Sequence, residues 1–216
     1  MPMNDVFAAI QQYAVAPVIA IESEASALPL ADALIAGGLP IAEITFRTEA
    51  AGAVIERLTR ERPELLVGAG TVLTIENLEA AHAAGAQFAV APGLNPAVVR
   101  RANELGLPFI PGIMTPSDIE AGLALGCYTL KFFPAGALGG AAMIKAIAGP
   151  YRHTGVRFMP TGGVNADNLA GYLALPEVAA VGGTWIAKKD DIAARAWKAI
   201  SARCRAIGEI RNAARP

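Results

Sequence analysis

The strongest constraint on the fold is a regular alternation of two kinds of segment along the chain. Short runs rich in Val, Ile and Phe are each followed by an amphipathic, alanine-rich stretch of about ten residues. The short runs predict strands at 17–21, 41–47, 65–71, 88–92, 109–113, 129–134, 157–162 and 178–184. The stretches between them predict helices at 27–37, 49–60, 74–84, 95–105, 115–125, 139–148 and 165–174, with another after Asp190. Eight strand–helix units in 216 residues favour an α/β protein, a single (β/α)8 TIM barrel.

Residues that begin and end helices stand at the expected boundaries. The N-cap candidates are Thr74, Asn95, Thr115 and Asn165. Glycine ends helices at positions 37, 85, 106, 126 and 149. An extra helix is predicted at 5–13, ahead of the first strand. We therefore expect one domain over 1–216, in which residues 1–16 cap the barrel with a helix and residues 188–216 form a C-terminal helix.

A doubly wound open sheet is the alternative fold. No G-x-G-x-x-G or P-loop motif follows the first predicted strand, which disfavours that alternative. The chain also shows no linker or low-complexity segment that would mark a domain boundary.

Composition disfavours several classes of protein. Hydrophobic residues make up 54% of the chain and charged residues 17%, which predicts a large core rather than disorder. The formal charge of −1 provides no global field for nucleic acid or a membrane surface. The charge-poor stretch 121–150 is interrupted by Lys131, Pro134 and several glycines, so it lacks the roughly 18–20 apolar residues of a membrane helix. The first residues lack the basic and apolar regions of a signal peptide.

Cysteine and histidine are too few to suggest a metal centre. Cys127 and Cys204 lie far apart without metal-like spacing, which is typical of reduced thiols in a cytosolic protein. Two histidines, His82 and His153, cannot supply a histidine-rich site. We therefore expect a cytoplasmic protein with no metal and no cofactor.

The segment 188–216 carries eight basic and three acidic residues. Aromatic residues do not interleave with the basic ones, apart from Trp197. A solvated helix face is therefore favoured over a site for a polyanion.

Lys131 lies in the middle of an apolar segment, 128–134, that predicts a short buried strand. Lysine is almost never fully buried without a partner or a purpose. An amine removed from water loses its proton more readily, and a free amine is a nucleophile. The position therefore predicts a Schiff base with a carbonyl substrate. The alternative is a core lysine that snorkels or pairs with a carboxylate.

Polar side chains are expected at the carboxyl ends of several predicted strands. In a (β/α)8 barrel the catalytic groups lie at these ends and in the loops that follow. Side chains alternate along a strand, so Glu43 and Arg47 share a face that must point to the barrel interior or its mouth. The residues expected to converge on one pocket are Glu43, Arg47, Thr71, Lys131 and Thr161.

This predicted cluster suits chemistry that passes through an imine. A neighbouring arginine favours an uncharged amine, and Arg47 can bind a substrate carboxylate bidentately. Forming and hydrolysing an iminium needs proton transfers, which a buried glutamate such as Glu43 can perform. A structural ion pair between Glu43 and Lys131 is the alternative.

Glycine pairs follow the last two predicted strands, at Gly162-Gly163 and at Gly182-Gly183, and Thr184 comes next. In many barrels the loops after these strands bind phosphate through backbone N–H groups. The two pairs together predict a phosphate site that needs no lysine.

Six short motifs recur at characteristic strand ends along the chain. They are Glu43-Ile-Thr-Phe-Arg-Thr48, Gly68-Ala-Gly-Thr-Val-Leu73, Ala91-Pro-Gly-Leu94, Ile110-Pro-Gly-Ile113, Leu130-Lys-Phe-Phe-Pro-Ala135 and Phe158-Met-Pro-Thr-Gly-Gly-Val164. In their order and spacing these motifs resemble one known family, the 2-keto-3-deoxy-6-phosphogluconate (KDPG) aldolases, which also include 4-hydroxy-2-oxoglutarate (KHG) aldolases. The resemblance covers about residues 10–190.

The resemblance implies a metal-free class I aldolase on a trimeric barrel in the Entner–Doudoroff pathway. The implied reaction is reversible cleavage of KDPG to pyruvate and glyceraldehyde 3-phosphate. Lys131 is implied as the Schiff-base lysine and Glu43 as the general acid and base. The residues implied at the pyruvyl end are Arg47, Thr71, Pro92 and Phe133. Those implied at the sugar-phosphate end are Thr161, Gly162, Gly163, Gly183 and Thr184.

Two positions depart from the pattern of the family. Some members carry a basic residue just after the first strand that helps to bind phosphate, whereas this chain has Glu22 and Glu24 there. Thr184 stands where serine is common. The alternatives with the same lysine chemistry are KHG, the 6-phosphogalactonate epimer and oxaloacetate as substrates. A non-catalytic ligand-binding barrel is the alternative from another class.

Overall fold

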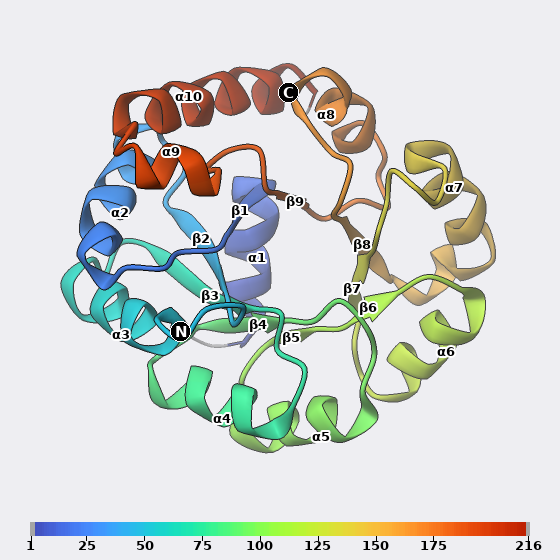
Figure 1. The fold of residues 1–216 in the computed structure, drawn as a ribbon. Helices are drawn as coiled ribbons and strands as arrows, with labels where there is room; N and C mark the ends of the chain where they lie inside the picture. The colour runs from blue at the N-terminus through green and yellow to red at the C-terminus, as the bar shows by residue number, and fades with distance from the viewer. Residues whose placement is uncertain (1–2, 215–216) are drawn as a thin grey trace.

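The chain forms parallel strands surrounded by a ring of helices (Figure 1). The computed structural model describes residues 3–214, apart from the side chain at position 4, so the predicted domain limits at 1 and 216 lie outside the described residues. The strands are β1 (Val15–Ile19), β2 (Ile41–Thr45), β3 (Leu66–Gly70), β4 (Phe88–Val90), β5 (Phe109–Ile110), β6 (Gly112–Ile113), β7 (Thr129–Phe132), β8 (Arg157–Pro160) and β9 (Val181–Gly183). They form a six-stranded sheet of order β5-β4-β3-β2-β1-β9 and a three-stranded sheet of order β6-β7-β8.

The segment predicted as one strand at 109–113 is two strands. Pro111 has no backbone N–H and divides the segment, so β5 pairs with β4 whereas β6 pairs with β7. The carbonyl of Pro111 still accepts a hydrogen bond from the N–H of Lys131 at 2.8 Å. The interruption at Pro111 therefore carries the chain from the six-stranded sheet to the three-stranded sheet.

The edge strands β8 and β9 of the two sheets also meet. Phe158 of β8 forms an isolated parallel bridge with Val178, and Thr161 forms another with Gly182 of β9. The N–H of Ala179 donates to the carbonyl of Phe158 at 2.8 Å. The predicted α/β class with a parallel sheet is therefore observed, as a curled six-stranded sheet and a three-stranded sheet joined by isolated bridges.

Helices follow the strands as the sequence predicts. They are α1 (Met3–Tyr13), α2 (Ala27–Ala36), α3 (Ala51–Glu61), α4 (Ile75–Ala83), α5 (Pro96–Leu105), α6 (Pro116–Ala124), α7 (Gly140–Ala148), α8 (Ala166–Leu173), α9 (Lys189–Ala193) and α10 (Trp197–Ala214), with 3₁₀ turns η1 (Glu24–Ser26) and η2 (Gly149–Thr154). All four predicted N-caps accept a hydrogen bond from a backbone N–H of the first turn; they are Thr74, Asn95, Thr115 and Asn165.

Gly149 follows the last residue of α7, as predicted, but its φ of −47° is right-handed and the chain continues as η2 until Gly155, where φ is +78°. Two other boundary predictions are wrong. The helix predicted after Asp190 is two helices, α9 and α10, which are separated at Arg195 with a left-handed φ of 53°. β2 ends at Thr45 rather than at 47, so Arg47 lies in a turn.

One hydrophobic core extends through the described chain. It contains strand residues such as Phe88, Phe132 and Phe158, and also Val6 and Ile10 of α1. Figure 1 shows α1 inside the ring formed by the other helices, next to the strands. No helix over residues 3–214 is long and apolar enough to cross a membrane.

Candidate active site

Lys131 and Glu43 meet in the interior, as predicted. Lys131 lies on β7 and is 4% exposed, and Glu43 lies on β2 and is 0% exposed. The Nζ atom of Lys131 lies 3.4 Å from Oε1 of Glu43. The lysine therefore belongs to the three-stranded sheet and the carboxylate to the six-stranded sheet, and the pair forms where the two sheets face each other.

One oxygen of the Glu43 carboxylate, Oε1, is the partner of the Lys131 amine. Oε2 is buried and accepts no hydrogen bond from the described residues. The arrangement leaves a buried acceptor free for a proton or for a substrate hydroxyl.

Gly70, the last residue of β3, provides the space that Glu43 occupies. A Cβ atom at position 70 would lie 2.7 Å from Cγ and 2.9 Å from Cδ of Glu43, which is closer than real Cβ atoms approach. Any side chain there would push the carboxylate away from its place beside Lys131. The sequence analysis missed this role, although Gly70 lies in one of the six motifs.

Phe133 lies beside the lysine. The Nζ atom of Lys131 is 5.7 Å from the centroid of the Phe133 ring. A Cβ atom at Gly162 would lie 3.2 Å from the same ring, so the glycine turn after β8 packs closely on Phe133. The ring thus connects the lysine with the first predicted phosphate turn.

Arg47 lies at the rim rather than in the interior. Its side chain is exposed, and its Nε donates to Oγ1 of Thr45 at 3.2 Å. The Thr45 hydroxyl in turn donates to the carbonyl of Ile19 at 3.0 Å, which fixes it to β1. Within residues 3–214 the two Nη atoms of Arg47 make no hydrogen bond or ion pair, so they are free to bind an anion. Thr45 therefore positions the Arg47 side chain.

Thr71 directly follows β3, and Pro92 lies two residues after the end of β4. Thr71 is half-buried and has a left-handed φ of 57°. Pro92 packs against Gly112, where an added Cβ would overlap the Pro92 carbonyl. The structure therefore brings Lys131, Glu43 and Phe133 together and leaves Thr71 and Pro92 beside them at neighbouring strand ends.

The predicted phosphate residues lie at the ends of β8 and β9. Gly162 and Gly163 have φ of 87° and 79°, which side chains rarely adopt, so this turn requires glycine. Thr161 is buried and packs against Gly182, where a Cβ atom would strike the Thr161 hydroxyl. Gly183 is buried beneath the ring of Trp185.

Thr184 is exposed directly after Gly183. Gly162 and Gly163 therefore form a turn after β8, whereas Gly182 and Gly183 are the last residues of β9 rather than a turn. The Thr161–Gly182 bridge places the two glycine pairs next to each other.

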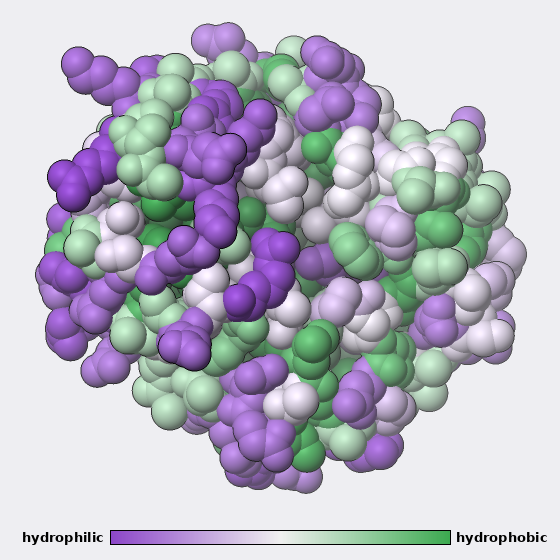
Figure 2. Space-filling view, in the orientation of Figure 1, coloured by the Kyte–Doolittle hydropathy of each residue, from purple (hydrophilic) through white to green (hydrophobic). Residues whose placement is uncertain are grey.

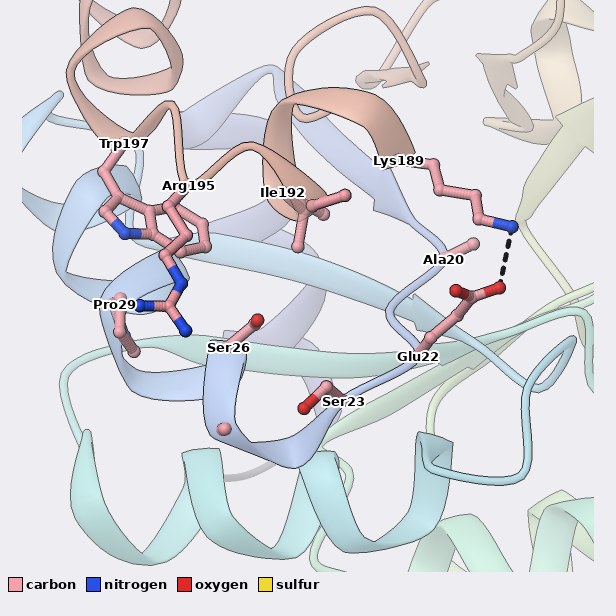
Figure 3. A pocket seen from close by; sticks show the side chains of 11 residues that line it. Ala20, Glu22, Ser23, Ser26, Pro29, Lys189, Ile192, Arg195 and Trp197 are labelled. Carbon is pink, nitrogen blue, oxygen red and sulfur yellow. Dashed lines mark ion pairs between the residues drawn. The ribbon is translucent and has the colours of Figure 1, made fainter.

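A cavity of about 440 Å³ opens between the start of α2 and the segment of α9 and α10 (Figure 3). Lys131 and Glu43 do not line it. Glu22 and Ser26 line one wall, and Lys189, Arg195 and Trp197 line the other. The Nζ atom of Lys189 lies 2.7 Å from Oε1 of Glu22 across this cavity.

Other reactive or metal-binding groups are sparse. Burial raises the pKa of Cys127 and of Cys204 to about 11, so both are protonated thiols at neutral pH. Neither cysteine forms a disulfide. Over residues 3–214 no three His, Cys, Asp or Glu side chains gather in a group that could hold a metal ion.

The family model for KDPG and KHG aldolases matches residues 6–203. The chain belongs to this aldolase family. It is 47% identical to the 2-dehydro-3-deoxy-phosphogluconate aldolase of Treponema pallidum, over 93% of this chain and 94% of that protein.

Two solved structures of aldolases are similar to the whole chain. A KDPG aldolase from Legionella pneumophila, captured at low pH with pyruvate as a covalent carbinolamine intermediate, has a TM-score of 0.89 and 42% identity. The match covers 96% of this chain and 98% of that one. The KDPG aldolase of Zymomonas mobilis with 3-phosphoglycerate has a TM-score of 0.86 and 38% identity, and the match covers 95% of each chain.

Proposed function

We propose that this protein is a class I aldolase that cleaves KDPG reversibly to pyruvate and glyceraldehyde 3-phosphate. The observation that carries the proposal is the buried Lys131 amine, which lies 3.4 Å from the buried Glu43 carboxylate. The carbinolamine captured in the Legionella aldolase supports it, because a carbinolamine is the first adduct of an amine with a ketone. A non-catalytic barrel would have no need of this pair.

The mechanism follows from the two buried side chains. The Lys131 amine attacks the C2 ketone and forms a carbinolamine, which loses water to give an iminium. The iminium accepts the electron pair of the C3–C4 bond as that bond breaks, and the aldehyde leaves. Glu43 moves protons in the collapse of the carbinolamine, in the cleavage and in protonation of the enamine at C3. Hydrolysis of the last imine releases pyruvate and the free lysine.

The remaining site residues bind the substrate in this proposal. Arg47 takes the carboxylate with its free Nη atoms, and Thr71, Pro92 and Phe133 surround the pyruvyl end. Thr161 binds a substrate hydroxyl. The phosphate lies at the glycine pairs, on residues Gly162, Gly163, Gly183 and Thr184.

We also infer that the two sheets form one closed (β/α)8 barrel in a single domain, with α1 capping one end. The isolated bridges from β8 to β9 and the division at Pro111 support closure. A homotrimer in the cytoplasm is the expected assembly. Exposed apolar side chains such as Leu73 and Met114, which are 51% and 49% exposed, are candidates for its contacts.

The phosphate assignment predicts strong preference for a phosphorylated substrate. KDPG should exceed its unphosphorylated analogue in kcat/KM on the order of 10²-fold or more, because the phosphate contacts lower the barrier. Inorganic phosphate should compete weakly. Steady-state pyruvate release with the two substrates measures this preference. Equal kcat/KM values would mean that the glycines are only turns and that a short 2-keto acid such as KHG is the natural substrate.

Metal removal is expected to leave the rate unchanged. In the proposed mechanism the iminium accepts the electron pair, so no step requires a cation. The test is pyruvate release after dialysis against EDTA, with and without added Mg²⁺ or Mn²⁺. A rate that falls on chelation and returns with either ion would contradict the role of Lys131.

A further inference from the structure

The strand order places three charged residues in succession at the carboxyl ends of neighbouring strands of the six-stranded sheet, which we call the mouth. β1 lies between β2 and β9 in the six-stranded sheet. Arg47 follows β2, Glu22 follows β1 and Lys189 follows β9. The Thr48 hydroxyl donates to the carbonyl of Ile21 at 2.7 Å, which ties the turn of Arg47 to the segment of Glu22. The mouth thus presents a cation, an anion and a second cation side by side.

Glu22 and Lys189 form an ion pair with each other. Their charged atoms lie 2.7 Å apart, and both side chains are 63% exposed. The hydrogen bond to Glu22 raises the pKa of Lys189, so the lysine stays charged at neutral pH. Within residues 3–214 neither side chain has another ion pair or hydrogen bond. Exposed pairs of this kind contribute little to stability, so a more highly charged anion can replace Glu22.

The pair lies on the two segments that follow β1 and β9, and β9 ends at Gly183 of the proposed phosphate site. Gly183 is opposite Pro17 in the register of β9 and β1, so the segments that continue these strands leave the sheet together. One leads through Thr184 to Lys189, and the other leads to Glu22. Figure 2 shows hydrophilic residues on this side of the face, in the region of α9. A phosphate at Gly183 would therefore meet the ion pair.

We propose that Lys189 binds the substrate phosphate, and that without substrate Glu22 holds Lys189 in an ion pair that the phosphate replaces. This proposal rests on the aldolase function proposed above. Glu22 has room to withdraw, because both side chains line the cavity of about 440 Å³ (Figure 3). Arg195 lines the same cavity, and within the described chain its side chain makes no ion pair or hydrogen bond. It attracts the released carboxylate away from Lys189.

This exchange acts as a selectivity device. A phosphate dianion competes well with a single carboxylate for Lys189, whereas the weaker charge of a short 2-keto diacid does so poorly. This gives a role to Glu22, the acidic residue after the first strand that departs from the family pattern. It keeps Lys189 occupied against ligands that carry less charge than a phosphate.

The test compares kcat/KM for KDPG and for KHG in wild type, Lys189→Met and Glu22→Gln. Lys198→Met is the matched control, since Lys198 is an exposed lysine of α10. Lys189→Met should lower the KDPG-to-KHG ratio about 10-fold, the effect of losing one charge-assisted contact. Glu22→Gln should tighten competitive inhibition by inorganic phosphate about two- to fivefold, the value of an exposed ion pair. Lys198→Met should change neither quantity.

Several results would overturn the proposal. A ratio in Lys189→Met equal to that of wild type would remove Lys189 from the phosphate site. Weaker phosphate inhibition in Glu22→Gln would show that Glu22 supports binding rather than competing with it. Borohydride trapping of pyruvate on wild type distinguishes failure of the exchange at Lys189 from failure of the proposed aldolase function. An adduct with an unchanged ratio refutes only the exchange, whereas no adduct refutes the aldolase function and the exchange with it.

Discussion

Replacing Lys131 with arginine is expected to abolish aldol cleavage nearly completely. Arginine keeps the positive charge beside Glu43, but its guanidinium stays protonated at neutral pH and forms no imine with a ketone. Pyruvate release from KDPG by Lys131→Arg, followed in a coupled assay, should fall to background. Circular dichroism and the melting temperature check that the variant is folded. Lys145→Arg, at an exposed position on α7, is the matched control and should keep the wild-type rate.

Covalent trapping locates the reactive amine directly. Pyruvate with borohydride should add one three-carbon group to the wild-type chain, and peptide mass spectrometry should find it on Lys131. The chain has four other lysines to serve as internal controls, at positions 145, 188, 189 and 198. Label on one of those positions, or no label, would refute the proposed mechanism even if the substitution removed activity.

The second large effect is expected for Glu43→Gln. Glutamine keeps the shape of the side chain beside Gly70 and removes the group that exchanges protons. General acid–base catalysis is typically worth about 10²–10⁴-fold, so kcat should fall by that order with a smaller change in KM. Rates of pyruvate release over a range of KDPG concentrations give both constants.

Trapping in the same variant separates two roles of Glu43. If Glu43 moves protons, Glu43→Gln should form the pyruvate adduct more slowly than wild type but still on Lys131. If Glu43 only holds the lysine in place, kcat should stay near normal. That outcome would indicate that Lys131 and Glu43 form only a structural ion pair.

Hydrophobic periodicity was sufficient to predict most helices and strands, because each short run and each amphipathic stretch carries its own pattern. It failed where pairing partners decide the structure. Pro111 marks a possible interruption in the segment 109–113, but the sequence does not say that β5 pairs with β4 whereas β6 pairs with β7. The break between α9 and α10 could not be predicted either, because Arg195 adopts a left-handed φ there and arginine has no preference for that conformation.

The meeting of Lys131 and Glu43 could be predicted because strand alternation and the barrel hypothesis together fix where side chains point. The support around the pair could not be predicted. Gly70 makes room for a carboxylate that comes from another strand, and its role depends on a contact distance rather than on a pattern. The Lys189–Glu22 pair joins distant parts of the sequence through exposed side chains, for which hydrophobic periodicity carries no information.

Because Lys131 and Glu43 lie on different sheets, imine formation with pyruvate should report whether the two sheets of one chain are docked. Lys131 and Glu43 are 88 residues apart and meet only when the three-stranded sheet lies against the six-stranded one. A partly unfolded chain in which the sheets have separated would retain its lysine, now exposed to water and without the carboxylate. Adduct formation measured through a urea titration would then follow the docked fraction of molecules. Far-ultraviolet circular dichroism would follow the helices independently, so any gap between the two curves would reveal an intermediate with intact helices and undocked sheets.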